Sequence, residues 1–206
     1  MKKIVFVVLL LIISIGAVEK VSVGSIESAE GTFKVDEQQE LSIKQAIELA
    51  YPAALEWDEN AQLLDAVNID LDDKAEKSIG SNGKRKYWNI NFGVPDTHKN
   101  FLVTIYKGEI EEKKDFTVDG NSPYPKKDFI ALEDIKYDSP ELLKKALKMG
   151  NVYPGKDWAK GYNFMLIKNR ETNITMMLVV GWNSDGTEMK AAGFNASTGE
   201  YIKPDL

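Results

Sequence analysis

The chain lacks cysteine and has a single histidine, His98, among its 206 residues. Without cysteine it cannot have a disulfide framework, a thiolate metal site or a lipid attached through a cysteine. One histidine excludes a zinc site built from several histidines. Arginine is also scarce, because Arg85 and Arg170 are the only two. The fold must therefore be stabilised by its apolar core, without covalent or metal cross-links.

A basic surface is absent as well. The formal net charge is -6, whereas binding to a phosphate backbone needs clustered lysine and arginine. We therefore expect no nucleic acid partner, and the same acidic balance weakens any role in binding anionic lipid. The hydrophobic share of 43% is that of a globular protein, not of a disordered one.

The first residues have the pattern of an export signal. Lys2 and Lys3 precede an apolar run at 4–18, which is short for a membrane span of ~20 residues. We expect 1–29 to be a signal peptide, with an uncleaved N-terminal anchor as the alternative. Either way, the remainder is predicted to be secreted or extracytoplasmic, with membrane contact only through that anchor. Residues 30–40 lack periodicity and are predicted to be a tether.

Two segments carry helix signals. Ser42 and Gln45 form a capping box, and apolar residues at helical spacing follow at Ile43, Ala46, Ile47, Ala50 and Ala54. Pro52 is predicted to end or kink this helix. A second helix is expected over 139–149, capped by Ser139 with Pro140 at its first position. Its predicted buried stripe consists of Leu142, Leu143, Ala146 and Leu147.

Strand-like runs follow each predicted helix. The alternation and β-rich composition predict strands at 63–71, 86–94, 101–106, 162–167, 174–182 and 189–194. Asn183 to Gly186 has the composition of a hairpin turn, with Gly186 at positive φ. Leu178 lies mid-strand in a run that is apolar on both faces, and we expect it to share a core with Leu147.

This order predicts an α+β fold made of two modules, each a helix packed on an antiparallel β-meander. Module 1 spans 41–110, a linker spans 111–132, and module 2 spans 133–206. The copies begin about 97 residues apart, counting from Ser42 to Ser139. If the linker joins self-contained modules, the fragment 133–206 folds alone.

A metal site is not expected. Acidic residues cluster at Asp70, Asp72, Asp73 and Glu76. A calcium-binding EF-hand loop needs glycine at its sixth position and glutamate at its twelfth, which this stretch lacks. We interpret the cluster as a solvated strand end and predict no metal and no cofactor.

A catalytic site is not expected either. His98 lies in a polar turn beside Asp96, where a base would be exposed and not desolvated. No G-x-S-x-G elbow is present, and no third group is evident to orient a serine–histidine pair. We predict no catalytic residues and no enzyme activity, and expect His98→Ala to change stability by no more than roughly 0.5 kcal/mol.

Aromatic residues leave two alternatives open. The candidates are Tyr87, Trp88, Phe92, Trp158, Tyr162 and Trp182. Any one of them is favoured as a core residue, but tryptophan and tyrosine are also the usual anchors of binding surfaces.

The helix from Ile43 to Ala50 and the terminal Phe194-Asn195-Ala196-Ser197-Thr198-Gly199-Glu200-Tyr201-Ile202 resemble the PepSY and PepSY-like domains of bacterial envelope proteins. Those domains typically end on a strand followed by Asp-Ala-x-x-Gly-x-hydrophobic, and Asn195 stands here in place of the Asp. The first half has only the shortened Tyr106-Lys107-Gly108-Glu109-Ile110. The resemblance implies an exported α+β module that binds or restrains a peptidase, here in trans because no protease domain follows.

We therefore expect an exported, non-catalytic binding module whose partner is a protein, such as an extracytoplasmic peptidase or another envelope protein. The alternatives are a small-ligand carrier with a pocket between helix and curved sheet, and a purely structural envelope spacer. A concave apolar pocket favours the carrier, whereas an exposed aromatic patch or a flat sheet edge favours a protein partner.

Overall fold

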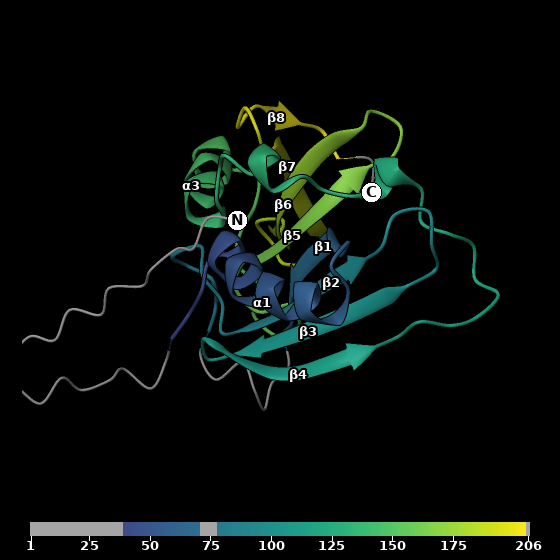
Figure 1. The fold of residues 1–206 in the computed structure, drawn as a ribbon. Helices are drawn as coiled ribbons and strands as arrows, with labels where there is room; N and C mark the ends of the chain where they lie inside the picture. Colours follow the sequence, from purple (N-terminus) through teal and green to yellow (C-terminus); the bar gives the residue numbers. More distant parts are fainter. Residues whose placement is uncertain (1–38, 71–77, 205–206) are drawn as a thin grey trace, which may run out of the picture. The chain divides into compact units, whose positions relative to one another are not determined.

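The computed structural model describes residues 39–70 and 78–204 (Figure 1). All of them belong to one compact unit, Asp36–Leu206. The predicted signal at 1–29 lies outside the described residues, as do the predicted tether up to residue 38 and the acidic candidates Asp72, Asp73 and Glu76. The fold contains both helix and sheet, as the composition and periodicity predict.

One antiparallel sheet of eight strands forms the centre of the unit, in the order β4-β3-β2-β1-β5-β6-β7-β8. The strands are β1 (Gln62–Asn68), β2 (Tyr87–Gly93), β3 (Asn100–Tyr106), β4 (Glu109–Asp115), β5 (Asn163–Asn169), β6 (Ile174–Trp182), β7 (Met189–Asn195) and β8 (Tyr201–Ile202). Gly186 has φ 74° and its N–H donates to the Asn183 carbonyl, which confirms the predicted β6–β7 turn.

The predicted fold class of two modules, each with its own helix on a meander, is wrong. Strands β1 and β5 pair directly, at Ala66 with Leu166 and Val67 with Met165, so the sheet continues from one half into the other. One core cluster also includes buried residues from both halves. An unpaired strand edge is available for pairing with another strand. Here β1 and β5 pair with each other, so neither is left as an open edge of the sheet.

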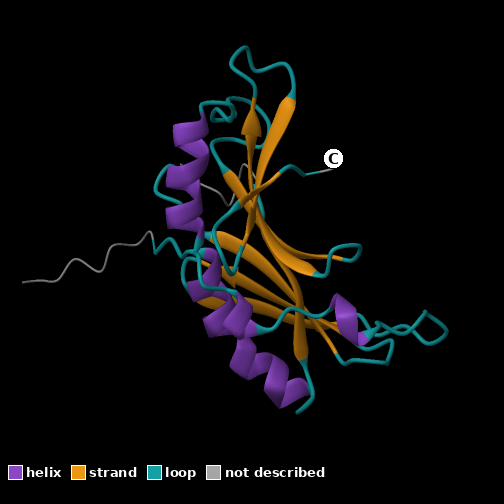
Figure 2. Cartoon of the chain, turned by 90° about the horizontal axis from the view of Figure 1, so that it is seen from above, coloured by secondary structure: helices purple, strands orange, loops and turns teal. Residues whose placement is uncertain are grey.

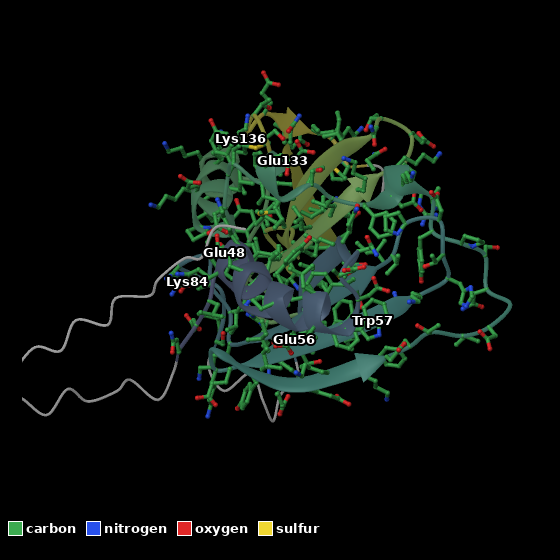
Figure 3. The ribbon with its side chains drawn as sticks, viewed as in Figure 1. Glu48, Glu56, Trp57, Lys84, Glu133 and Lys136 are labelled. Atoms are coloured by element: carbon green, nitrogen blue, oxygen red, sulfur yellow. The ribbon has the colours of Figure 1, made fainter. Side chains whose placement is uncertain are left out.

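Both α-helices of the described residues lie on the same side of the sheet, as Figure 2 shows. Helix α1 (Ile43–Trp57) packs across β1 to β5, and α3 (Ser139–Met149) packs on β6. The face of α1 turned away from the sheet carries Glu48 and Glu56 (Figure 3). At its end, Trp57 stacks on Phe101 with ring centroids 4.9 Å apart.

Helix α1 confirms its predicted capping box and buried face but not its predicted end. The Ser42 hydroxyl accepts from the Gln45 N–H, the Gln45 side chain accepts from the Ser42 N–H, and the predicted apolar positions are all buried. The helix continues through Pro52 to Trp57. Pro52 and Glu48, whose carbonyl loses its helical donor, are both exposed, so water can satisfy that carbonyl.

Helix α3 differs from prediction in two places. Its N-cap is Asp138, with Ser139 as the first helical residue, and Leu147 is 42% exposed. Leu142, Leu143 and Ala146 are buried as expected. Because α3 packs on the sheet mainly through β6, its stripe of contact is narrower than its apolar pattern. Leu178 is buried, but it alternates with the helix-facing Met177 and Val179 and so lies on the other face of the sheet.

The connection between the halves is docked on the sheet. Residues 109–115 form β4, after which the chain includes the short 3₁₀ helices η1 (Lys126–Asp128) and η2 (Leu132–Asp134). Ile130 forms a bridge with Leu63, and the Tyr124 carbonyl accepts from the Asp96 N–H at 2.8 Å. The boundaries predicted at 110 and 133 stay predictions.

Candidate binding surface around Trp158

Trp158 is 63% exposed, the largest fraction among the exposed large hydrophobic residues of the described chain. Its ring meets the Trp182 ring edge to face at a centroid distance of 5.6 Å. The Trp182 Nε1–H donates to the Trp158 carbonyl at 3.2 Å. The exposed indole thus contacts a second tryptophan, and that tryptophan also hydrogen-bonds to the loop backbone at Trp158.

The loop that carries Trp158 is closed by backbone hydrogen bonds at its base. Tyr153 and Trp182 exchange two N–H···O bonds of 2.8 Å, and Gly155 and Gly161 exchange two of 2.9 Å. A Cβ on Gly155 would meet the Trp182 Nε1 at 2.6 Å, so glycine is required for the close approach. These hydrogen bonds fix the backbone at the base of the loop that carries Trp158.

A buried ion pair from the first half of the chain secures the other side of the loop. Arg85, with a side chain only 1% exposed, pairs with Asp70 at 2.9 Å. The second Asp70 carboxylate oxygen accepts from the Lys160 N–H at 2.6 Å, and Arg85 donates to the Lys160 carbonyl at 3.1 Å. Desolvation lowers the pKa of Arg85, although the Asp70 charge opposes this shift.

Asp70 therefore serves as a structural acceptor. It was one of the four acidic candidates, and the other three lie outside the described residues. A buried pair of this kind mainly fixes geometry, since desolvation offsets much of its attraction. Among residues 39–70 and 78–204, no group of three or more histidine, cysteine or acidic residues is arranged to hold a metal ion.

Two hollows lie beside Trp158. One, of about 320 Å³, is lined by Tyr153, Trp182 and the turn that includes Asp185. The other, of about 300 Å³, is mostly apolar and is lined by strand residues such as Met165 and Val180. Both volumes are at the lower limit for small-molecule pockets, and they fit single side chains of a partner. We call Trp158 with these two hollows the Trp158 surface.

The other aromatic candidates are divided between core and surface. Trp88 and Phe92 are fully buried, Tyr162 is buried, and Tyr87 is half-buried against Tyr106. Together with Phe164, Trp88 and Phe92 fill the space between helices and sheet. The sequence offered these residues as alternatives, and it gave no signal that singled out Trp158. Trp158 is distinguished only by the folded structure, which places its loop against Asp70 and Trp182.

The outer edge of the sheet at β4 is a poor surface for strand addition. All seven β4 residues are exposed, and the five that follow Ile110, from Glu111 to Asp115, are all charged. Charged side chains along an edge discourage pairing with another chain. The aromatic surface is therefore the better candidate for contact with a partner.

His98 is half-buried in its turn, with 36% of its side chain exposed, and its Nε2 lies 3.3 Å from a carboxylate oxygen of Asp119. Asp119 is itself fully exposed, so the pair is in contact with solvent and offers no desolvated base. The absence of enzyme activity stays a prediction.

No protein-family model and no curated protein matches the chain. Among solved structures, the fold is similar to that of a "putative lipoprotein" from Clostridium difficile 630, with a TM-score of 0.52 and 14% identity. The match covers 75% of this chain and 88% of the other. At this identity the likeness shows a shared fold. Within the part of the chain that the structure describes, no helix has the length and apolar character that a membrane span requires.

Proposed function

We propose that this protein is an exported, non-catalytic binding module that contacts another secreted or envelope protein through the Trp158 surface. The observation that carries the proposal is Trp158 itself, which is 63% exposed while its ring packs against Trp182 and its backbone carbonyl accepts a hydrogen bond from Trp182. An aromatic side chain that is already ordered loses little conformational entropy on binding, which is the property of an interface anchor.

The surroundings of Trp158 support a protein partner. Tyr153 and Met189 are also exposed apolar residues, and each lines one of the two hollows. Exposed apolar residues of this kind, rimmed by polar residues, are characteristic of interaction sites. Asp157 and Asp185 supply polar groups at the rim. A carrier pocket between helix and sheet is less well supported, because large side chains occupy that space.

Export is part of the proposal. Lys2 and Lys3 before an apolar run support it, and a structural neighbour described as a lipoprotein is compatible with it. Because this chain has no cysteine, it would be secreted or held by its N-terminal segment, without a cysteine-linked lipid. A peptidase as the partner, which the PepSY resemblance implies, remains a prediction.

A differential capture experiment tests the proposal. Wild-type protein, Trp158→Ala and Tyr201→Ala are used as baits against culture supernatant and envelope extract. Tyr201 is a matched control, because it is also aromatic and 46% exposed but lies on β8. We expect a protein that wild type and Tyr201→Ala retain and Trp158→Ala loses. The proposal would be contradicted if Trp158→Ala retained that protein as well as wild type does. It would also be contradicted if the bait protein converted a captured protein enzymatically.

A further inference from the structure

The larger of the two hollows beside Trp158 is bounded by aromatic rings. Trp158, Trp182 and Tyr153 all line it. The planes of the two indoles are inclined at 76°, with the ring centroids 5.6 Å apart, so the rings form two walls of a corner. Tyr153 is 42% exposed, and its hydroxyl donates to the Gly150 carbonyl at 3.1 Å. Because an aromatic face carries partial negative charge, the corner is attractive to a cation.

Two carboxylates line the same hollow. Asp157 precedes Trp158 in the loop, Asp185 lies in the β6–β7 turn, and both are exposed. Asp157 has no hydrogen bond or ion pair with any other described residue. The Asp185 carboxylate accepts from the Thr187 hydroxyl at 2.6 Å and from the Thr187 N–H at 3.1 Å, and these bonds lower the pKa of Asp185. Both acids therefore present negative charge at the hollow at neutral pH.

Lys156 lines the hollow as well and is the cation that the chain itself supplies there. Within the described residues its ammonium forms no ion pair and does not lie over an aromatic ring, whereas Lys145 lies 4.4 Å from the centroid of the Tyr137 ring. Two carboxylates against one ammonium leave one excess negative charge at the hollow. The chain as a whole has a net charge of -6. The charge of the hollow is thus complementary to a cation on a partner.

The chemistry of these walls favours a guanidinium group. A guanidinium is planar, stacks on aromatic faces and can donate hydrogen bonds to a carboxylate from its edge at the same time. It is also more weakly hydrated than an ammonium, so it loses less on leaving water. The volume of about 320 Å³ admits a side chain. A metal ion is disfavoured, because no three acidic or histidine residues of the described chain converge to hold one.

We propose that this hollow binds an arginine side chain of the protein partner, with its guanidinium stacked on the corner of Trp158 and Trp182 and hydrogen-bonded to Asp157 or Asp185. The inference rests on the proposed function and names the group that the partner presents to the Trp158 surface. The second hollow is mostly apolar and shares only Trp158 with the first. The specificity for charge is therefore confined to one of the two hollows.

Titration of the purified protein with acetyl-Ala-Arg-Ala-amide tests the site, with the indole N–H NMR signals of Trp158 and Trp182 as the readout. Trp57 and Trp88 line neither hollow and serve as internal references. The matched control is acetyl-Ala-citrulline-Ala-amide, because citrulline has nearly the shape of arginine and no charge. We expect saturable shifts with the arginine peptide and binding of the citrulline peptide that is weaker by about fivefold or more. Added salt should weaken the binding of the arginine peptide.

Variants assign the binding to the rings and the carboxylates. Trp158→Ala, followed by the Trp182 signal, should weaken binding of the arginine peptide by about fivefold. Asp157→Asn and Asp185→Asn should each weaken it by about two- to fivefold. Lys156→Gln should strengthen it by about twofold, because the competing cation is removed. Asp119→Asn alters a fully exposed carboxylate that lines neither hollow and should leave binding unchanged.

The proposal is overturned if the citrulline peptide binds as tightly as the arginine peptide, or if no titration saturates. Tighter binding of acetyl-Ala-Lys-Ala-amide, or weaker binding by Lys156→Gln, would overturn it as well. Failure of the proposed function is a separate result of the capture experiment, in which Trp158→Ala loses no protein. If Trp158→Ala loses a protein that a double variant, Asp157→Asn with Asp185→Asn, retains undiminished, the proposed function stands and the arginine site is refuted.

Discussion

Ser139 should be among the most costly positions to truncate, because the N-termini of α1 and α3 meet on it. The residue is fully buried, and its hydroxyl accepts from the Ile43 N–H at 3.1 Å and donates to the Gly83 carbonyl at 2.7 Å. The neighbouring Asp138 carboxylate accepts from the Ser139 N–H at 2.7 Å and from the Lys44 N–H at 3.2 Å. Adjacent residues of α3 therefore satisfy the open end of α1 as well.

The cost of Ser139→Ala can be worked out from these contacts. Alanine leaves the Ile43 N–H and the Gly83 carbonyl without this buried partner, and each unsatisfied group costs about 1–3 kcal/mol. We expect a loss of about 2–6 kcal/mol in the free energy of unfolding, a large part of the 5–15 kcal/mol typical of a domain. The loss should appear in both halves together, because Ser139 belongs to the second half of the chain and its two partners belong to the first.

Urea unfolding followed by tryptophan fluorescence and by far-UV circular dichroism measures this loss. We expect one transition for Ser139→Ala, coincident in both signals, with a lower midpoint and an unchanged m value. Ser184→Ala is the control, since Ser184 is exposed in the β6–β7 turn and should change stability by less than about 0.5 kcal/mol. A cost for Ser139→Ala as small as the control's, or two separate transitions, would refute the reasoning.

Three further predictions test the core, the electrostatics and the domain plan. Leu142→Ala should cost about 2–5 kcal/mol in urea unfolding, and Leu147→Ala less than about 1 kcal/mol because that side chain is 42% exposed; equal costs would contradict the observed helix face. Burial raises the pKa of Asp65, so its stabilising contribution is complete below about pH 4 and is lost as pH rises through the folded pKa. Asp65→Asn should therefore be more stable than wild type at pH 7, and the gain should vanish in acid. The Lys99 hydrogen bond lowers the pKa of Asp58, so Asp58→Asn should show the opposite sign at pH 7, also fading in acid. A fragment 133–206 should lack a cooperative urea transition, because β5 loses β1 and the shared core; a two-state transition would show that it folds alone.

The sequence by itself determined the local elements. The capping box of Ser42 and Gln45, the apolar positions of α1 and the strand over 174–182 all follow from spacings of a few residues. The hairpin turn at Gly186 likewise follows from one glycine that accepts positive φ. Strand β4 was missed because its sequence, Glu109 to Asp115, has no apolar alternation, and it lies exposed at the sheet edge.

Only the tertiary structure decided how these elements combine. Whether β1 and β5 pair with each other depends on strands about 100 residues apart, which no local period encodes. Trp158 is exposed and Trp88 is buried, although the local sequence does not distinguish the two tryptophans. The ion pair of Asp128 with Arg170 likewise joins the docked connection to the second half of the chain. Burial and hydrogen-bond satisfaction are properties of residues brought together from distant parts of the chain, so they arise only when the sheet closes across both halves.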